Sequence, residues 1–327
     1  MKLLIIGNEA RAKKYLPDLP ITHEVEIVIA ERGTSDDEIL KHASDADFIL
    51  ADAIAPVSAH LINGMPNLKL IHSEGVAYNA IDLDAARVRG IAVCNNAGTN
   101  ANGVAEQVVL LMLACLRDAI NADAAVRAGQ QIQTKERMMV EGIRELGDCT
   151  VGFIGFGAIG QATAQRLRPW GCTMLYNKRH ALSTTEEERL GVVFASIDQL
   201  TESCDIISIH VPVTEETRGM LNETFFARMK PQAILINTAR GEIVDNAALV
   251  AALESGKLKA AGLDTVSPEP VEPDNPLLNL SEEAARRVVF SPHIAGVTEG
   301  MFYRAHRTAW ENIARVVAGE KPINLVS

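Results

Sequence analysis

The sequence predicts an α/β protein made of two doubly wound parallel-sheet domains with a cleft between them. Its 327 residues and 35.3 kDa correspond to about two domains of ordinary size. Short apolar or β-branched segments alternate with helically patterned segments over the first hundred residues, and a second alternation of this kind begins near residue 150. Such alternation is typical of parallel sheets whose faces are covered by helices.

The first alternation contains short apolar strands separated by helices. Its strands are predicted at 2–7, 24–30, 48–51, 68–72 and 91–94, and its helices at 35–43, 58–63 and 81–89. A long helix is predicted over 101–117, and a second stretch over 119–129 follows it. The polar segment 130–147 is interpreted as a surface connection.

The second alternation starts with a strand, turn and helix at 150–168. Its further strands are predicted at 172–176, 192–195, 205–211, 233–237, 260–263 and 288–290. An amphipathic helix follows residue 293 and comes too late in the chain to belong to this second sheet. We therefore expect one domain made of residues 1–99 and 295–327, and a second made of residues 100–294.

Composition excludes several classes of partner. The chain has 47% hydrophobic and 22% charged residues and a formal net charge of −11, so no binding to nucleic acid is expected. No apolar run approaches the roughly 20 residues that span a bilayer, and the amino terminus reads as a first strand, so we expect a cytoplasmic protein without membrane contact. Its five scattered cysteines predict neither disulfides nor a metal site.

A glycine-spaced turn opens the second domain. Gly155 permits a tight turn, Gly157 lets the backbone approach a pyrophosphate, and Gly160 lets the following helix pack closely. The free N–H groups of Ala158 and Ile159 would then face the anion. Because a strand precedes this turn and a helix and second strand follow it, we predict a Rossmann dinucleotide-binding domain, preceded by a flavodoxin-like substrate domain.

Two cations follow the second strand of this unit, which ends in Asn177-Lys178-Arg179. An NAD-binding unit would place an acid there for the ribose hydroxyls, and that acid would repel a 2′-phosphate. Lys178 and Arg179 can instead donate charge-assisted hydrogen bonds to the phosphate. The alternative is an ordinary solvated basic loop. We expect NADP(H) to be preferred, with NAD(H) as a second cofactor.

Three motifs behind the glycine turn carry a family resemblance. They are Asn237-Thr-Ala-Arg240-Gly241, the segment Gly262 to Pro270, and Ser291-Pro292-His293-Ile-Ala-Gly296. Together they resemble the D-isomer-specific 2-hydroxyacid dehydrogenases, and the segments 204–214, 100–106 and 68–82 also fit that family. The resemblance covers nearly the whole chain.

The resemblance implies that Arg240, Glu269 and His293 are the catalytic trio. In the reduction of a 2-keto acid, a hydride reaches the carbonyl carbon while an acid protonates the oxygen, and histidine suits that proton transfer. His293 would be the proton donor, and Glu269 would orient its ring and favour the charged form. Arg240 would clamp the substrate carboxylate and polarise the carbonyl.

The resemblance also implies ligand contacts outside the trio. Asp264 should contact the nicotinamide carboxamide, while Val211, Thr238 and Ala239 should line the nicotinamide pocket at their strand ends. In the other domain, Gly75 and Val76 should offer backbone N–H groups to the substrate carboxylate.

The loop that contains Gly75 departs from the family pattern at Glu74, Ala77 and Tyr78. An unpaired carboxylate beside an anionic substrate is unfavourable, so Glu74 is interpreted either as a plain surface acid that points away or as a neighbour of the substrate. The identity of the substrate therefore stays open.

The sequence thus predicts an NADP(H)-preferring reductase of small 2-keto acids such as glyoxylate or hydroxypyruvate. One alternative is an NAD-dependent D-2-hydroxyacid or 3-phosphoglycerate dehydrogenase, but the second would need an extra cation near 72–79. An alternative of another class is a nucleotide-sensing scaffold that resembles the family's corepressor relatives. The resemblance also implies a homodimer, with the helix 101–117 as a candidate interface element.

Overall fold

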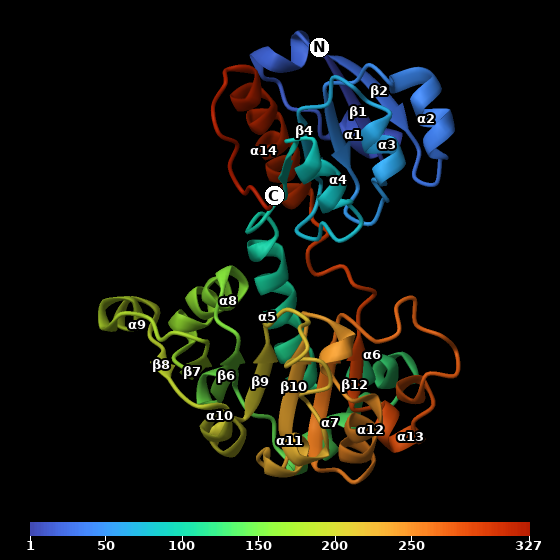
Figure 1. Cartoon of the computed structure of the whole chain (residues 1–327). Helices are drawn as coiled ribbons and strands as arrows, with labels where there is room; N and C mark the ends of the chain where they lie inside the picture. Colours follow the sequence, from blue (N-terminus) through green and yellow to red (C-terminus); the bar gives the residue numbers. More distant parts are fainter. The chain divides into compact units, whose positions relative to one another are not determined.

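The computed structural model describes all residues from 1 to 327 and divides into two compact units. Unit 1 contains residues 1–100 and 297–327, and unit 2 contains residues 101–296. Each unit is a parallel sheet with helices on both faces, which confirms the predicted fold class (Figure 1). None of the helices is both long enough and apolar enough to cross a bilayer.

The sheet of unit 1 has five parallel strands in the order β2-β1-β3-β4-β5. Successive strands are added on one side of β1 and then on the other, so the strand order reverses between β1 and β3, which is the flavodoxin-like switch point. The strands are β1 (Lys2–Ile6), β2 (Glu26–Ala30), β3 (Phe48–Ala51), β4 (Leu70–Ser73) and β5 (Ala92–Cys94).

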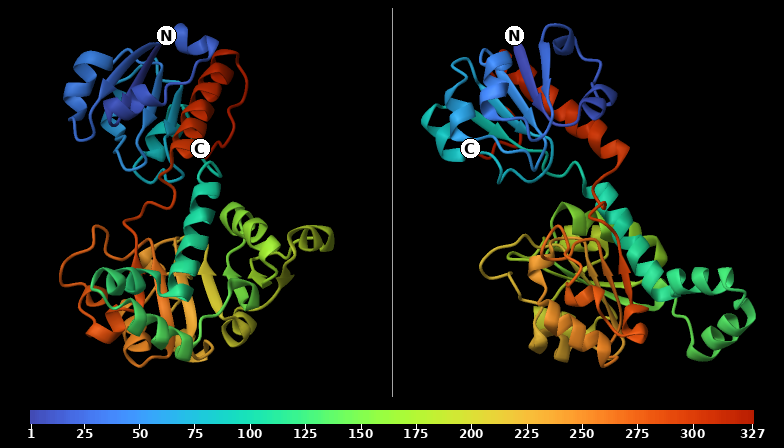
Figure 2. Two further views of the ribbon diagram at one scale, coloured as in Figure 1. Left: turned by 180° about the vertical axis from the view of Figure 1, so that it is seen from behind. Right: turned by 90° about the vertical axis from the view of Figure 1, so that its right-hand side faces the viewer.

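Two layers of helices enclose this sheet (Figure 2). One layer contains α2 (Asp36–Ala43), α3 (Ala59–Asn63) and α4 (Leu83–Val88), which pack on the side chains of Leu4 and Ile6. The other contains α1 (Glu9–Lys14), the 3₁₀ turn η1 (Pro20–His23) and the C-terminal helix α14 (Glu299–Val317). The fully buried Trp310 anchors α14 against Leu3 and Ile5, so the end of the chain completes the core of its first hundred residues.

The sheet of unit 2 has seven parallel strands in the order β12-β11-β10-β9-β6-β7-β8. Its switch point lies between β6 and β9, as in a Rossmann fold. The strands are β6 (Thr150–Ile154), β7 (Thr173–Asn177), β8 (Val193–Phe194), β9 (Ile206–Ile209), β10 (Ala233–Asn237), β11 (Leu258–Leu263) and β12 (Val288–Phe290).

Helices α5 (Ala101–Arg117) and α8 (Ala158–Leu167) cover one face of this sheet, and α10 (Ile197–Ser203), α11 (Glu223–Arg228) and α12 (Asn246–Glu254) cover the other. Helix α5 buries most of its residues, and burial of each large apolar side chain contributes about 1.5–3 kcal/mol. The remaining short elements are α9 (Thr184–Leu190), α13 (Glu282–Ala285), η2 (Leu146–Asp148), η3 (Arg168–Trp170), η4 (Gly241–Ile243) and η5 (Pro276–Leu278).

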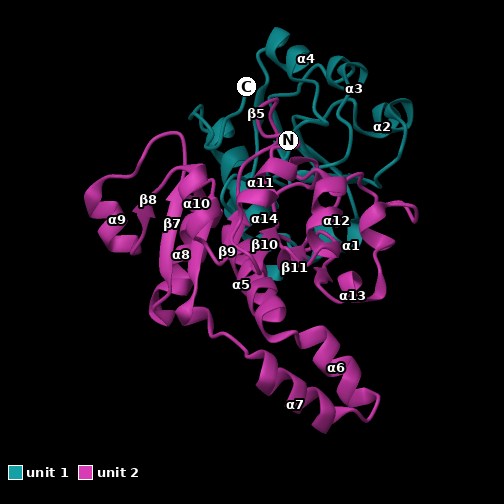
Figure 3. Cartoon of the chain, turned by 90° about the horizontal axis from the view of Figure 1, so that it is seen from below, with its two compact units in different colours: residues 1–100, 297–327 teal, residues 101–296 magenta.

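A helical hairpin projects from unit 2 (Figure 3). It consists of α6 (Ala119–Arg127) and α7 (Gln131–Glu141). The segment 130–147 is almost wholly exposed, as its interpretation as a surface connection implies, but its first part forms a helix, α7, that was not predicted. Neither helix of the hairpin buries a residue, and α7 is supported on its own surface by the Arg137–Glu141 ion pair of 2.7 Å. A helix without a buried stripe leaves little hydrophobic periodicity in the sequence.

Candidate active site

The glycine turn lies at the switch point of the unit 2 sheet, directly after β6. Gly155 has φ of +86°, and a Cβ there would lie 2.5 Å from the carbonyl oxygen of His210 at the end of β9. Only glycine allows both this left-handed conformation and this close approach. The turn therefore joins the ends of β6 and β9 at the edge where doubly wound sheets bind ligands.

Helix α8 begins at this turn with an open amino terminus. Its N-cap residue is Gly157, which supplies no side-chain hydrogen bond, and a Cβ on Gly157 would meet no atom within 4 Å. The N–H groups of Ala158 and Ile159 in the first turn are thus available to an anion, while Gly160 is buried against the preceding turn. These features fit a dinucleotide pyrophosphate.

The cationic segment follows β7 directly. The strand ends at Asn177, whose amide donates to the Ala195 carbonyl at 2.8 Å, so a neutral amide occupies the last strand position. Lys178 is half-buried, Arg179 is exposed, and neither forms an ion pair. The Tyr176 hydroxyl, which accepts from the Leu182 N–H at 2.7 Å, holds the far end of the loop. Both cations are therefore free to meet a phosphate.

Residues predicted to line the nicotinamide pocket lie at neighbouring strand ends. Val211 is half-buried after β9 and approaches Gly155, while Thr238 and Ala239 follow β10. The Thr238 hydroxyl is buried without a hydrogen-bond partner, and so is that of Thr265 after β11. Buried hydroxyl groups normally find partners. These two orphaned hydroxyls fit a polar ligand group at this edge, and Thr265 was not among the predicted residues.

Two further groups near β9 help to shape this edge. Ser208, on the strand itself, forms a 2.9 Å hydrogen bond with Nε2 of His210. Burial lowers the pKa of His210 to about 3, which keeps this ring neutral. The strand-end position of His210 was visible in the sequence, but nothing there indicated its burial.

Arg240 follows β10 in a turn that Asn237 organises. The Asn237 side chain accepts from the Ala239 N–H at 3.0 Å and donates to the Arg240 carbonyl at 2.9 Å. The guanidinium of Arg240 donates to the Ala239 carbonyl at 2.7 Å and has no carboxylate partner. A Cβ on Gly241 would collide with the backbone of Val266 and Ser267, so the Arg240 turn packs directly on the segment that leads to Glu269.

His293 and Glu269 form a close pair in unit 2. The Nδ1 of His293 lies 2.6 and 2.8 Å from the two carboxylate oxygens of Glu269. The His293 side chain is 37% exposed, that of Glu269 is 53% exposed, and the Nε2 of His293 makes no hydrogen bond. The structure thus places a carboxylate on one ring nitrogen and leaves the other free to exchange a proton with a ligand.

Asp264 holds the His293 segment in place. Its buried carboxylate accepts from the Ser291 hydroxyl at 2.5 Å, the Ile294 N–H at 3.1 Å and the Ala295 N–H at 2.9 Å, and its carbonyl accepts from the His293 N–H at 2.8 Å. These bonds fix His293 at φ of +54°. A contact between Asp264 and the nicotinamide carboxamide would have to use a lone pair of this carboxylate that is not already engaged in these hydrogen bonds.

Two asparagine side chains, neither of them among the predicted site residues, hold the loop that carries Glu269 by hydrogen bonds. Asn246 and Asn275 both donate to the Ser267 carbonyl, at 2.7 and 2.9 Å. Asparagine in a loop after a strand is a general turn signal, and only the folded chain shows that both side chains meet one carbonyl.

The predicted substrate loop lies in unit 1, after β4. Every carbonyl from Ser73 to Ala77 accepts a hydrogen bond. Asn96 donates to the carbonyls of residues 73 and 74 from its side chain and to that of residue 75 from its N–H. The Asn95 side chain donates to the Val76 carbonyl, and the Ser73 hydroxyl donates to the Ala77 carbonyl. The Gly75 N–H donates to the Ser73 hydroxyl at 3.3 Å, whereas the N–H groups of Val76 and Ala77 have no partner within the chain. This loop therefore presents two unpartnered backbone donors, of which Val76 was predicted and Ala77 was not.

Glu74 is not a plain surface acid. It is 8% exposed, and its carboxylate pairs with Arg11 at 2.6 Å and with Nε2 of His306 at 2.7 Å. A buried carboxylate needs such partners, because its desolvation is otherwise unfavourable. The surface-acid interpretation fails since the sequence gives no sign that residues this distant meet.

Comparisons with known proteins identify the family. Residues 109–295 match the family model described as D-isomer specific 2-hydroxyacid dehydrogenase, NAD binding domain. The chain is 35% identical over 304 residues to a glyoxylate reductase of Korarchaeum cryptofilum, covering 93% of this chain and 90% of that protein. It is also 35% identical over 288 residues to a D-3-phosphoglycerate dehydrogenase of Mycobacterium bovis, covering 88% of this chain but 52% of that protein.

Among solved structures, D-2-hydroxyisocaproate dehydrogenase superposes with a TM-score of 0.87 at 25% identity and covers 100% of this chain and 99% of its own. The family match spans more than half of the chain, and the glyoxylate reductase similarity extends through both units. The chain therefore belongs to the D-isomer-specific 2-hydroxyacid dehydrogenases, a family of oxidoreductases that bind a nicotinamide dinucleotide.

Proposed function

We propose that this protein reduces small 2-keto acids such as glyoxylate or hydroxypyruvate with NADPH. The observation that carries the proposal is the His293–Glu269 pair, in which a carboxylate holds Nδ1 at 2.6 Å while Nε2 stays free. A general acid needs this arrangement, because the transferred proton must leave from an accessible nitrogen. The similarity to glyoxylate reductases supports the substrate class.

In this proposal His293 donates a proton from Nε2 to the substrate carbonyl oxygen. The carboxylate of Glu269 compensates the positive charge of the imidazolium and fixes the ring plane. Asp264 accepts hydrogen bonds from the backbone at and after His293, and these bonds hold the proton donor in place.

Arg240 binds the substrate in this proposal. Its guanidinium has no competing carboxylate partner, so its remaining donors can grip a carboxylate and the adjacent carbonyl oxygen. The contact between Gly241 and the 266–267 backbone sets the position of Arg240 relative to the Glu269 loop.

The cofactor, when bound, supplies the hydride that reaches the carbonyl carbon. The open amino terminus of α8 would hold its pyrophosphate, and Thr238 would meet its nicotinamide half. Lys178 and Arg179 would bind a 2′-phosphate, since both are free of ion pairs and follow a strand that ends in a neutral amide.

Steady-state kinetics with both reduced cofactors and a panel of 2-keto acids test the proposal. The doubly substituted K178A/R179A protein should lose at least about 10²-fold in kcat/KM for NADPH, since each charge-assisted bond contributes roughly 1.5–3 kcal/mol. Its kcat/KM for NADH should change little. Lys257→Ala, at the opposite edge of the same sheet, is the matched control and should affect neither cofactor.

Equal or better use of NADH by the native chain would refute the NADP preference. A preference for 3-phosphoglycerate in the same panel would favour the alternative activity. Near the 73–77 loop, Arg11 is paired with Asp52 and Glu74, whereas the 54% exposed side chain of Arg32 lies 3.9 Å from Asp52. Absence of turnover with every acid would favour the scaffold alternative.

We further propose that the protein is a homodimer joined through the α6–α7 hairpin. Helix α5, the element first expected at the interface, is used mainly inside its own unit. The hairpin instead exposes large apolar side chains, namely Ile120, Val126, Ile132, Met139 and Val140. Surfaces of this kind mark protein contacts. Sedimentation should show a dimer for the native chain and a monomer for M139K/V140E, and a monomeric native chain would refute the proposal.

A further inference from the structure

We infer that Arg11 and His306 are positioning residues for substrate binding, which hold and neutralise Glu74 beside the anion-binding loop 73–77. The inference rests on the proposed function, in which this loop takes the substrate carboxylate. It concerns the part of the loop that departs from the family pattern. Glu74 directly precedes Gly75, and its own N–H is bound to the Ala51 carbonyl at 2.7 Å.

The backbone of the loop is arranged for an anion. Asn95, Asn96 and Ser73 occupy all five carbonyl groups from 73 to 77, so the unpaired backbone groups left on the loop are donors. Successive N–H groups without partners, such as those of Val76 and Ala77, form an anion-binding concavity. A free carboxylate next to this concavity would oppose the same anion.

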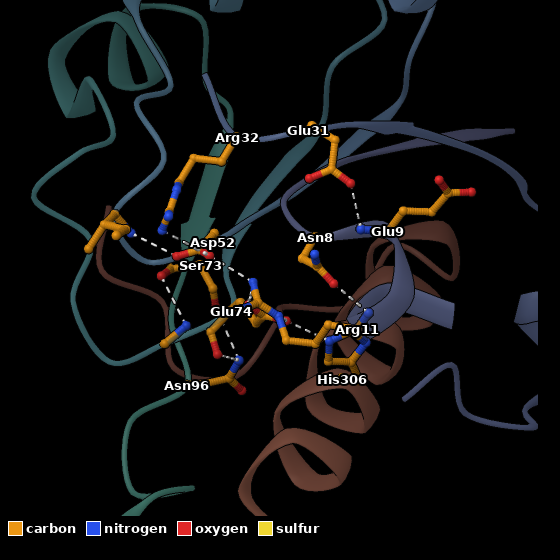
Figure 4. Close-up of polar contacts among 12 residues, drawn as sticks. Asn8, Glu9, Arg11, Glu31, Arg32, Asp52, Ser73, Glu74, Asn96 and His306 are labelled. Atoms are coloured by element: carbon orange, nitrogen blue, oxygen red, sulfur yellow. Dashed lines mark hydrogen bonds and ion pairs between the residues drawn. The ribbon is translucent and has the colours of Figure 1, made fainter. Parts of the chain in front are cut away.

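Two groups pair with the Glu74 carboxylate, and a third fixes one of them in place (Figure 4). Arg11, on α1, approaches both oxygens of the Glu74 carboxylate, with Nε 3.1 Å from Oε1 and Nη2 2.6 Å from Oε2. His306, on α14, reaches Oε1 from the other side at 2.7 Å and is 1% exposed. Asp52, after β3, accepts from Nη2 of Arg11 at 2.7 Å and fixes the guanidinium.

The network lies at the switch point of the unit 1 sheet. Asn8 and Arg11 follow β1, Asp52 follows β3 and Glu74 follows β4, so the carboxyl ends of three strands contribute. A doubly wound sheet binds ligands at this point. In unit 1 the Arg11 side chain occupies the switch point. The 73–77 loop is therefore the part at the carboxyl ends of these strands that can face a ligand.

This geometry assigns an electrostatic role that differs from simple tethering. If Arg11 only tied the loop to α1, removal of Arg11 would disorder the loop whether residue 74 were charged or neutral. If Arg11 masks the charge of Glu74, its removal leaves both Glu74 and Asp52 without this partner, although Asp52 keeps Arg32 at 3.9 Å. Glu74 would then repel the substrate, and neutralising residue 74 should cancel most of the defect. The two roles therefore predict opposite results for the double variant.

The experiment measures KM and kcat for the best 2-keto acid in the native chain, R11M, E74Q and R11M/E74Q. We expect R11M to raise the KM for the keto acid about tenfold or more, as like-charge juxtaposition does at an interface. The kcat and the KM for NADPH should change less than about threefold, because the reacting groups belong to unit 2. R11M/E74Q should return the KM to within about threefold of the native value.

Two further measurements keep the inference falsifiable if R11M folds poorly. H306L should raise the KM for the keto acid, whereas H306Q, which keeps a donor for Glu74, should not. Higher ionic strength should reduce the R11M defect only slightly, since Glu74 is 8% exposed and salt screens a buried charge less than an exposed one. K69M is the matched control. It removes the 2.8 Å ion pair with Asp47 at the amino ends of the strands of the same sheet, and it should leave the KM unchanged.

A double variant as impaired as R11M would overturn the masking role, and so would an R11M defect that appears in kcat alone. An active native chain with either of these results leaves the proposed function standing. A native chain that reduces no 2-keto acid overturns both the function and the inference.

Discussion

Each unit has a set of an arginine, a glutamate and a histidine near the carboxyl ends of its strands. In unit 2 they are Arg240, Glu269 and His293, and in unit 1 they are Arg11, Glu74 and His306. The two histidine–glutamate distances are nearly equal, at 2.6 and 2.7 Å. Burial separates the two sets, because the His293 side chain is 37% exposed and that of His306 is 1% exposed.

The two arginines differ in the same direction. The Arg11 guanidinium is paired with two carboxylates of the protein, those of Asp52 and Glu74. The Arg240 guanidinium is paired with none and donates to a backbone carbonyl. A buried, mutually paired set holds backbone in place, and an exposed set with a free donor can act on a ligand. The comparison teaches that residue types alone do not separate a supporting cluster from the proposed reaction centre, whereas pairing and exposure do.

The largest expected effect tests the exposed set. His293→Ala should lower kcat for keto-acid reduction by about 10² to 10⁴, the usual contribution of a general acid. Thermal unfolding should change little, because the side chain is partly exposed and its ring contacts Glu269 alone among polar groups. The two readouts are steady-state kinetics and melting temperature. A folded H293A protein with native kcat would remove His293 from the mechanism.

Acid should destabilise unit 1 through a second buried histidine. In His72, Nδ1 donates to the Ser73 carbonyl and Nε2 accepts from Asn312, a pattern that suits only the neutral ring, and burial lowers its pKa to about 4. Between the ordinary pKa of about 6.5 and this value, the unfolded state binds a proton that the folded state does not. Stability should therefore fall by about 3 kcal/mol as the pH drops through this range.

Denaturant unfolding at pH 7 and pH 4.5 measures this loss. His72→Gln should be less stable at pH 7 but should show a shallower pH slope, because one proton fewer is bound on unfolding. Asp205, whose pKa lies well below its usual range despite opposing burial because Arg144 and Lys230 pair with it, contributes at lower pH than His72. An unchanged slope in H72Q would show that His72 is not the titrating group.

The glycines after the first strand of each sheet should respond differently to alanine. At Gly155 the new Cβ would lie 2.5 Å from a carbonyl oxygen with φ at +86°, and we expect a loss of about 2 kcal/mol in unfolding free energy together with weaker NADPH binding. At Gly7 the Cβ would meet the Arg11 side chain at 3.4 Å and Asp52 at 3.7 Å, which are ordinary contacts. G7A should therefore stay within about 1 kcal/mol of the native chain.

Chemical unfolding and cofactor titration, applied to both alanine variants, give the comparison directly. Equal losses in G155A and G7A would mean that the two turns are under the same constraint, against the structure.

The smallest effects concern the first helix after each turn. In unit 1, the Asn8 side chain accepts from the Arg11 N–H at 2.9 Å and caps α1, so Asn8→Ala should lose about 1 kcal/mol of stability. In unit 2, Gly157 leaves α8 uncapped, and Gly157→Ser should gain a few tenths of a kcal/mol while it weakens NADPH binding by occupying the same N–H groups. Tighter NADPH binding in G157S would contradict the open-terminus interpretation.

The sequence was sufficient for the architecture because buried parallel strands are continuous apolar runs, as in Ile206–Ile209 and Ala233–Asn237. It was insufficient for α7, whose side chains are not buried and so carry no marked core pattern. Short-range motifs indicated the glycine turn and the residues of the proposed trio, whose roles stay predictions.

Long-range pairing is the part that the sequence could not supply. Glu74 meets Arg11 across 63 residues of chain and His306 across 232, and no local rule relates such positions. The same limit hid the three hydrogen bonds that the Asp264 carboxylate accepts from the 291–295 segment.

Gly241 has a consequence for engineering this enzyme. Any side chain at 241 would enter the space of the Val266 and Ser267 backbone, so the loops that carry Arg240 and Glu269 behave as one mechanical part. A library that randomises residue 240 alone changes the side chain at that position while the backbone contact of Gly241 stays the same. A library that also varies residue 241 would displace the backbone of both loops, so a changed activity could come from the new side chain or from the altered geometry. The two positions, adjacent in the chain, should therefore never be varied together when specificity is the aim.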